Sequence, residues 1–331
     1  MQAIVMTGTG GPEVLVAREV PEPRPEAGEV LIRTEAIPVL YPETLLRSGV
    51  FPMAAELPAV FGFQAAGEVV EVGAGVDRDL VGRRVVVETA GAGSYAEFVR
   101  ASAESATPIP AGVSADDAAA AVMSGSVALA LLKAAHLTGT ETVLVEAGAT
   151  GVGSYLVQLA EQFGAARVIA TAGDAAKRER TRELGAADVV DHRDDDWTET
   201  LRGRLGDATV DVVFDSIGGS SAARLLDVMT PGSGRMLSYG WLSGAPAQVS
   251  AGDLPPPVGS PSSAALDPPG SRALRHTEPT SSTESTHSSP PSRRRCRSKT
   301  RPRRMSWSNH APRSARSFCG PAGIGSGQAG R

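Results

Sequence analysis

The stretch from residue 143 to residue 160 constrains the fold of this chain more than any other. It begins with the apolar run 143–145, passes through a turn that holds Gly148, Gly151 and Gly153, and continues with apolar residues at helical spacing. A strand, a glycine turn and a helix in this order are typical of a dinucleotide-binding unit. The glycines let the backbone approach a pyrophosphate at the helix N-terminus.

The residues that follow extend this pattern. They predict a strand over 167–171, a helix over 175–184, and further strands over 188–190 and 210–215. Strands and helices that alternate at this spacing favour an α/β fold with a doubly wound parallel sheet.

Residues 1–100 have a different character, with short β-branched runs separated by glycine and proline. We predict a small β domain whose strands lie at 3–6, 14–16, 30–34, 65–73 and 84–87. Residues 116–135 are rich in alanine and are predicted to form a helix that leads into the nucleotide-binding unit.

Several motifs stand at consistent spacing along residues 1–251. Residues 62–67, with Gly73 and Val76, resemble the GHExxGxxxxxGxxV signature, and residues 93–99 resemble the GsyAEy strand. The further matches are 147–161 to AAxGGVGxxxxQLAK, 182–191 to LGAdxVIdy and 211–219 to DvVfDsvGg. Together these motifs resemble the medium-chain dehydrogenase/reductase superfamily, in its zinc-independent quinone oxidoreductase (zeta-crystallin-like) branch.

The resemblance implies three parts. Residues 1–120 form the N-terminal part of a GroES-like catalytic domain, residues 121–251 form a Rossmann domain, and residues 252–331 form a tail outside the family pattern. It also implies hydride transfer from NAD(P)H to a quinone or an activated alkene. An enoyl-thioester reductase of the same superfamily is the alternative enzyme.

Zinc-dependent members of the superfamily hold the metal with Cys, His and Glu or Cys. Here Phe63 and Gln64 stand at the His and Glu of GHE, and residues 1–251 contain only His136 and His192 and no cysteine. Because three convergent zinc ligands cannot be assembled from these residues, we expect no zinc.

The cofactor site is predicted from the same resemblance. Thr150 replaces the first of the family's paired glycines, and its hydroxyl is able to donate a hydrogen bond. Lys177 aligns with the lysine that binds the 2′-phosphate, whereas Asp174 is able to bind ribose hydroxyls, so we favour NADP(H) over NAD(H). The predicted cofactor residues are Gly148, Ala149, Thr150, Gly151, Val152, Gly153, Ala172, Gly173, Lys177, His192, Ser216, Ile217, Tyr239 and Gly240.

The substrate pocket is predicted at a loop over 40–49, which resembles the family's NPxDxxxRxG loop. The predicted residues are Tyr41, Arg47, Phe63 and Gln64. Tyr41 is the candidate that protonates or orients a carbonyl oxygen of a small quinone or enone, the alternative being a packed aromatic ring.

Charge divides the chain at about residue 251. Residues 1–251 carry 19 Lys and Arg against 33 Asp and Glu, whereas residues 252–331 carry 13 against 4. The acidic part argues against general affinity for nucleic acid. The basic, Pro- and Ser-rich tail is a nucleic-acid-binding arm of a non-catalytic protein, a spacer, or the product of a shifted reading frame, which we favour because GC-rich DNA read off frame encodes this composition.

The tail also bears on assembly. The family's last sheet strand and the segment that completes the first domain are not recognisable after residue 252. A family-type homodimer is therefore doubtful, and we expect a disordered tail, poor solubility and weak or absent activity. No stretch approaches the roughly 20 apolar residues of a membrane span, and no signal peptide is visible, so we expect a cytoplasmic protein.

Overall fold

The described part of the chain builds separate β-sheets from residues 1–108 and residues 142–238. The structure is a computed structural model that describes residues 1–52, 55–89, 91–250 and 253. The predictions made for the tail over 252–331 lie outside the described residues, apart from Asp253.

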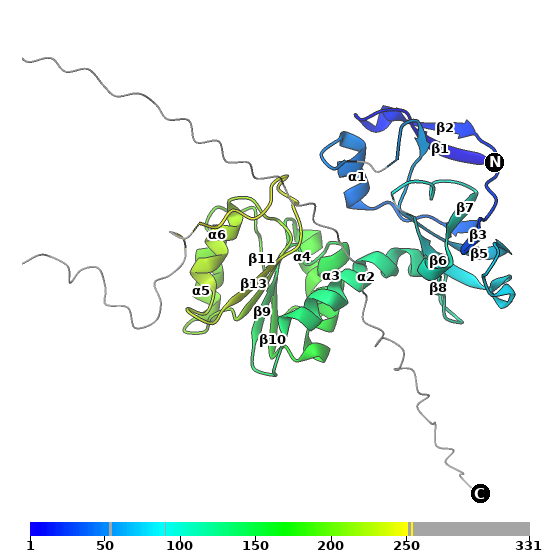
Figure 1. Cartoon of the computed structure of the whole chain (residues 1–331). Coiled ribbons are helices and arrows are strands. Elements are labelled where there is room, and N and C mark those ends of the chain that lie inside the picture. The colour runs from blue at the N-terminus through cyan, green and yellow to red at the C-terminus, as the bar shows by residue number, and fades with distance from the viewer. Residues whose placement is uncertain (53–54, 90, 251–252, 254–331) are drawn as a thin grey trace, which may run out of the picture. The chain divides into compact units, whose positions relative to one another are not determined.

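The N-terminal region contains two antiparallel sheets (Figure 1). One has the order β2-β1-β4, with β1 at Gln2–Met6, β2 at Leu15–Glu19 and β4 at Ala59–Val60. The other has the order β7-β3-β5-β6-β8, with β3 at Glu29–Ala36, β5 at Gln64–Val72, β6 at Arg84–Glu88, β7 at Phe98–Ser102 and β8 at Thr107–Pro108. Alternate residues of β3, β5 and β6 enter one core, among them Val30, Ile32 and Val85.

The segment predicted as a loop over 40–49 is mostly helical. Helix α1 runs over Tyr41–Ser48 and ends at Gly49, whose φ of 81° suits glycine. The Glu43 carboxylate accepts a hydrogen bond from the backbone N–H of Leu40 at 2.8 Å, so a side chain in the first turn satisfies the helix start.

Helix α2 covers Ala115–Ala135 and begins with Ser114, whose hydroxyl accepts the Asp117 N–H at 3.0 Å. By length and composition alone this helix is long and apolar enough to cross a membrane, contrary to our expectation that no stretch approaches a span. Part of this apolar stretch, 28%, is buried inside the protein. Ala118 and Ala119 lie in a core with β5 and β6, and Ala128 lies in the core of the second sheet.

The second sheet is entirely parallel, as predicted, with the order β11-β10-β9-β12-β13. Its strands are β9 at Thr142–Val145, β10 at Arg167–Thr171, β11 at Asp188–Val190, β12 at Val212–Asp215 and β13 at Arg235–Ser238. The strand order reverses between β9 and β12, which is where ligands bind in such sheets.

Helices cover both faces of this sheet (Figure 1). They are α3 at Gly151–Leu159, α4 at Ala175–Glu183, α5 at Trp197–Leu205 and α6 at Ser221–Leu225. Short 3₁₀ turns lie at Pro12–Val14, Arg78–Leu80, Ala103–Ser105, Glu161–Phe163 and Leu226–Val228.

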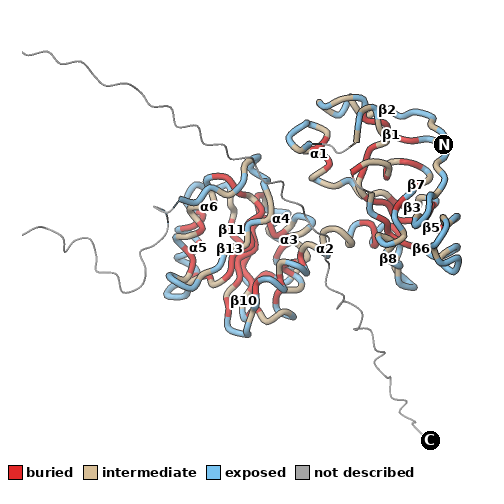
Figure 2. Tube along the Cα trace, in the orientation of Figure 1, coloured by how far each residue is buried: buried red, intermediate tan, exposed pale blue. Residues whose placement is uncertain are grey.

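Strands β9, β10 and β12 are buried along almost their whole length (Figure 2), and successive side chains enter different cores. Val143 and Val145 face the core that contains α2 and α3, whereas Leu144 faces the core of Trp197 and Leu201 from α5. Because both faces are covered, a site is confined to loops at the ends of the strands, and in sheets of this kind ligands bind at the carboxyl ends.

Candidate active site

The glycine turn after β9 is shaped by close packing. A Cβ on Gly148 would lie 2.9 Å from the Cβ of Ala170 and from Cγ2 of Thr181. A Cβ on Gly153 would lie 2.4 Å from the carbonyl oxygen of Ala147. These glycines therefore let α3 sit directly on the strands, with its first backbone N–H groups at the carboxyl edge of the sheet.

Thr150 is the residue that precedes α3, and its hydroxyl has a partner inside the turn. Its Oγ1 donates to the carbonyl oxygen of Ala147 at 2.7 Å. The hydroxyl is thus a donor, as expected, and in this structure its single hydrogen is used inside the turn.

A pocket of about 240 Å³ lies at the carboxyl ends of β9 and β10. Its wall contains six predicted cofactor residues, which are Ala149, Thr150, Ala172, Gly173, Lys177 and His192. Gly173 keeps the pocket open, because a Cβ there would lie 3.2 Å from His192 Nε2 and 3.3 Å from Arg193 Nε.

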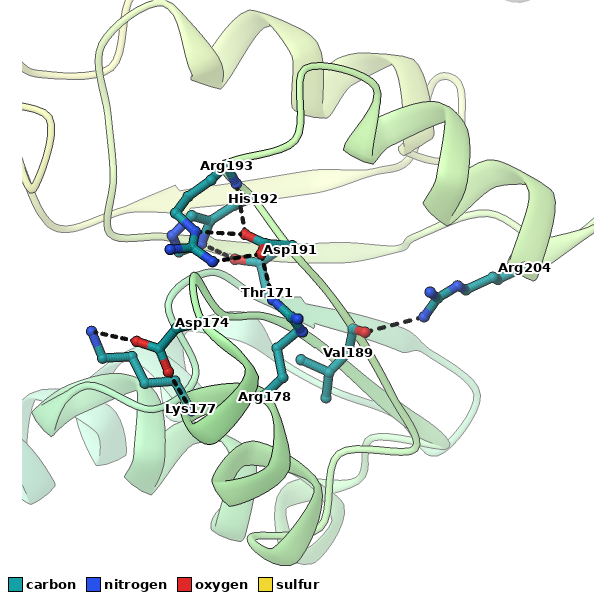
Figure 3. A network of polar contacts seen from close by, with 9 residues as sticks. All are labelled: Thr171, Asp174, Lys177, Arg178, Val189, Asp191, His192, Arg193 and Arg204. Atoms are coloured by element: carbon teal, nitrogen blue, oxygen red, sulfur yellow. Dashed lines mark hydrogen bonds and ion pairs between the residues drawn. The ribbon is translucent and has the colours of Figure 1, made fainter.

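The charges in this pocket are partly compensated (Figure 3). Asp174 caps α4, because its Oδ1 accepts the Lys177 N–H at 2.8 Å while its Oδ2 lies 3.5 Å from Lys177 Nζ. The Lys177 N–H is the main cause that lowers the pKa of Asp174. Arg193, which the sequence analysis did not include, binds Asp191 through Nε at 3.0 Å and through Nη2 at 2.8 Å.

A second cavity, of about 430 Å³, adjoins the same turn. Its wall contains seven predicted site residues, which are Tyr41, Thr150, Gly151, Val152, Ser216, Tyr239 and Gly240. Leu40, Met123 and Val127 make much of the rest apolar. Trp241, also in the wall, packs edge-on against Phe51 with the ring centroids 5.2 Å apart.

Three residues predicted for the substrate pocket do not line this cavity. The Arg47 guanidinium donates from Nη1 to the Gly10 carbonyl oxygen, and the backbone carbonyl oxygen of Arg47 accepts the Gly10 N–H at 2.8 Å. Gln64 is fully buried and donates from Nε2 to the Ala119 carbonyl oxygen at 2.9 Å. Phe63 packs on an apolar cluster of β1, α1 and β4 neighbours. The structure gives these three side chains packing and loop-anchoring contacts instead.

Glu43 is a site residue that the sequence analysis missed. Its buried carboxylate accepts the N–H groups of Leu40 at 2.8 Å and Phe63 at 2.9 Å, and the Tyr95 hydroxyl at 2.7 Å. Burial, together with Glu43, raises the pKa of the Tyr95 phenol. Glu43 thus fixes the backbone that presents Tyr41 to the cavity. Glu43 stands at the Asp position of the family's NPxDxxxRxG loop, and this match is the sequence signal that could have identified it.

Two buried carboxyl groups meet where the strand order reverses. Asp215, at the end of β12, accepts the N–H groups of Ile217 at 2.9 Å and Gly218 at 2.7 Å. Ile217 is a predicted cofactor residue and is positioned by this bond. Burial, with Asp215 beside it, raises the pKa of Glu146 well above its usual range. Burial and the neighbouring Asp215 therefore favour the protonated form of Glu146.

The zinc positions of the wider superfamily carry unsuitable donors. Phe63 has no ligating atom, and the amide of Gln64 is bonded to Ala119. Within residues 1–52, 55–89, 91–250 and 253, no three His, Cys, Asp or Glu side chains gather as a metal site. These residues do not fit a catalytic zinc ion.

A β domain followed by a parallel nucleotide-binding sheet, with a cavity at the glycine turn, defines a two-domain dehydrogenase. Residues 26–111 match the family described as Alcohol dehydrogenase GroES-like domain, and residues 151–256 match Zinc-binding dehydrogenase. The predicted fold class is confirmed.

Similar proteins of known activity identify the family within this class of dehydrogenases. The chain is 36% identical over 246 residues to Quinone oxidoreductase 1 of Escherichia coli, covering 74% of each protein. It is 35% identical over 249 residues to 2-haloacrylate reductase of a Burkholderia species, covering 74% of each. The chain belongs to the quinone oxidoreductase family of medium-chain dehydrogenases/reductases, which confirms the predicted resemblance.

Solved structures agree with this assignment. Mycobacterial Rv1454c complexed with NADPH matches with a TM-score of 0.69 and 38% identity, over 76% of this chain and 78% of that one. Escherichia coli quinone oxidoreductase complexed with NADPH matches with a TM-score of 0.71 and 35% identity, over 76% and 77%.

Proposed function

We propose that this chain is an NADPH-dependent oxidoreductase that transfers hydride to a quinone or an activated alkene without zinc. The observation that carries the proposal is that Thr150 lines both the pocket at Lys177 and the larger cavity at Tyr41. A dinucleotide laid along the glycine turn therefore reaches both. The relatives that reduce quinones and 2-haloacrylate, and the two NADPH complexes, support this reading.

The residues of the pocket and the turn fit the cofactor. Lys177 and Arg193 supply positive charge for a 2′-phosphate, and the N-terminus of α3 supplies N–H groups for the pyrophosphate. Asp174 is held as a helix cap, which reduces its capacity to accept ribose hydroxyls. Ser216, Ile217, Tyr239 and Gly240 are proposed to contact the nicotinamide half. NADPH, when bound, supplies the hydride from its nicotinamide ring.

The chain's own contribution to the reaction is orientation and a dry cavity. Apolar walls from Leu40, Met123 and Val127 exclude water from the reacting atoms. Tyr41, which is 46% exposed, is open to a substrate, and its hydroxyl is proposed to orient or protonate the carbonyl oxygen. Glu43 acts through the backbone to hold Tyr41 in place.

The proposal is tested by titrating the purified chain with NADPH and NADH while following protein fluorescence. We expect tighter binding of NADPH, followed by turnover with quinones, enones or 2-haloacrylates. Enoyl thioesters in the same panel test the alternative reductase, for which the structure gives no specific support. Equal binding of NADH contradicts the cofactor assignment, and stoichiometric bound zinc contradicts the zinc-free mechanism.

We also propose the boundaries 1–120, 121–251 and 252–331 for the domains and tail, a cytoplasmic location, and a departure from the family-type homodimer. The basis for the last is that β13 ends the sheet among the described residues and that no family strand is recognisable after residue 252. Sedimentation of the full chain tests it, and a stable dimer contradicts it. Salt-sensitive RNA binding would favour the non-catalytic alternative.

A further inference from the structure

His192 links the phosphate pocket to the glycine turn through Thr171. The Thr171 Oγ1 accepts the Ala147 N–H at 3.0 Å and lies 3.0 Å from His192 Nδ1. Thr171 is fully buried, so no water competes for these contacts. These two contacts fix the imidazole ring, and Figure 3 shows the one between Thr171 and His192.

The contact with Thr171 leaves Nε2 as the nitrogen that faces the pocket. The Thr171 hydroxyl is able to donate its hydrogen to Nδ1 of His192 or to accept from a protonated Nδ1, so the contact suits the neutral and the charged ring. Nε2 lies 3.2 Å from the Cβ position of Gly173, so it faces the open pocket. A doubly protonated ring thus presents a donor where the pocket also holds Lys177 and Arg193.

The charges around His192 come from every neighbouring element. Two of these residues, Asp191 and Arg193, follow β11 and pair with each other. Helix α4 contributes Lys177 and Arg178, of which Arg178 also pairs with Asp191. Asp174 caps that helix and lies near Lys177. Burial lowers the pKa of His192, the Asp191 carboxylate opposes this, and Arg193 and Lys177 add to the lowering. The free protein therefore holds a neutral imidazole at neutral pH.

A dianionic phosphate beside Nε2 reverses this balance. An opposite charge within about 4–6 Å favours the charged form of an ionisable group. The Thr171 oxygen has two lone pairs, so it can accept from a protonated Nδ1 as well as from Ala147. The site can therefore accommodate the imidazolium ion without losing the bond to the turn.

We propose that His192 takes up a proton when the 2′-phosphate of NADPH binds beside it, so that NADPH binding strengthens as the pH falls whereas NADH binding does not. This inference rests on the proposed function, since it requires NADPH to occupy the pocket. It makes His192 a pH-dependent determinant of cofactor preference.

The test measures Kd for NADPH and NADH between pH 6.5 and 8.5 for the full chain, His192→Gln and Arg180→Gln. Arg180→Gln is the matched control, because it removes a charge from α4 that pairs with Glu183 and does not line the pocket. Calorimetry in two buffers of different ionisation enthalpy counts the protons exchanged. A thermal melt of each variant confirms folding.

We expect the Kd for NADPH to decrease by up to about tenfold for each unit by which the pH is lowered, with proton uptake on binding. The Kd for NADH should stay nearly constant over the same range. In His192→Gln the uptake disappears. The sign is diagnostic, because a phosphate with a second pKa near 6 that binds as the dianion releases protons instead. Equal proton exchange in the full chain and His192→Gln overturns the inference. Failure to bind NADPH at any pH overturns the proposed function itself.

Discussion

Replacing Gly153 with alanine tests whether the glycine turn is set by packing. The added Cβ would lie 2.4 Å from the Ala147 carbonyl oxygen and 3.1 Å from its carbonyl carbon. Both atoms are backbone, so relief requires α3 to move by about 1 Å from β9, at an overpacking cost of about 1–3 kcal/mol. Alanine recovers up to about 1 kcal/mol of helix propensity. We expect the free energy of unfolding to fall by about 1–2 kcal/mol.

Gly203 in α5 provides the matched control, because a Cβ there meets nothing within 4 Å. Gly203→Ala should raise the free energy of unfolding by about 0.5–1 kcal/mol. Urea denaturation of both variants measures the difference. Because Gly153→Ala shifts the α3 N–H groups, it should also weaken NADPH binding about tenfold, whereas Gly203→Ala should not. A Gly153→Ala protein as stable as Gly203→Ala, with normal NADPH affinity, would refute the packing argument.

Three further variants test individual side chains. Asp174→Asn keeps a capping residue but removes the negative charge beside Lys177. NADPH should therefore bind about three- to tenfold more tightly, with the Kd for NADH little changed. An unchanged ratio of the Kd values for NADH and NADPH contradicts this prediction. The pKa of Glu146 is raised in the folded state, so the folded protein binds this proton more tightly than the unfolded chain does. Its contribution to the free energy of unfolding is therefore full at a pH below the usual carboxyl pKa, and it declines as the pH rises. Glu146→Gln should therefore flatten the dependence of the urea midpoint on pH above about 4.5, and equal slopes would count against a protonated Glu146. Tyr41→Phe should lower kcat by about a hundredfold with the Kd for NADPH unchanged, and a loss below twofold would exclude Tyr41 as the proton donor.

The parallel sheet was predictable because its signals are local. The run over 143–160 carries strand, turn and helix in one stretch, and β9 and α3 form there. Helix α1 was predicted as a loop because the family motif that it resembles is a loop, although Pro42 in the first turn is compatible with a helix start. Its stability depends on the Glu43 carboxylate, whose partners Phe63 and Tyr95 lie far along the chain. Tertiary contacts of this kind leave no periodic pattern.

The pocket at Lys177 was predictable for a geometric reason. Carboxyl ends of adjacent parallel strands meet at one edge, so Gly173 after β10 and His192 after β11 come together. The substrate residues were harder, because a motif does not say which way a side chain points. Arg47 and Gln64 hold backbone carbonyls instead of lining the cavity.

Charge neutralisation at the carboxyl edge connects these observations. Residues 1–251 carry an excess of acidic side chains, yet the proposed ligand is an anion. Asp191 is compensated by two arginines, and burial with Asp215 beside it raises the pKa of Glu146, which favours its neutral form. Asp174 is the carboxylate left among the described residues of the phosphate pocket, and its pairing with Lys177 is a long, exposed contact at 3.5 Å. Such a contact is weak and easily exchanged for a phosphate, so Asp174 limits the preference for NADPH without abolishing it.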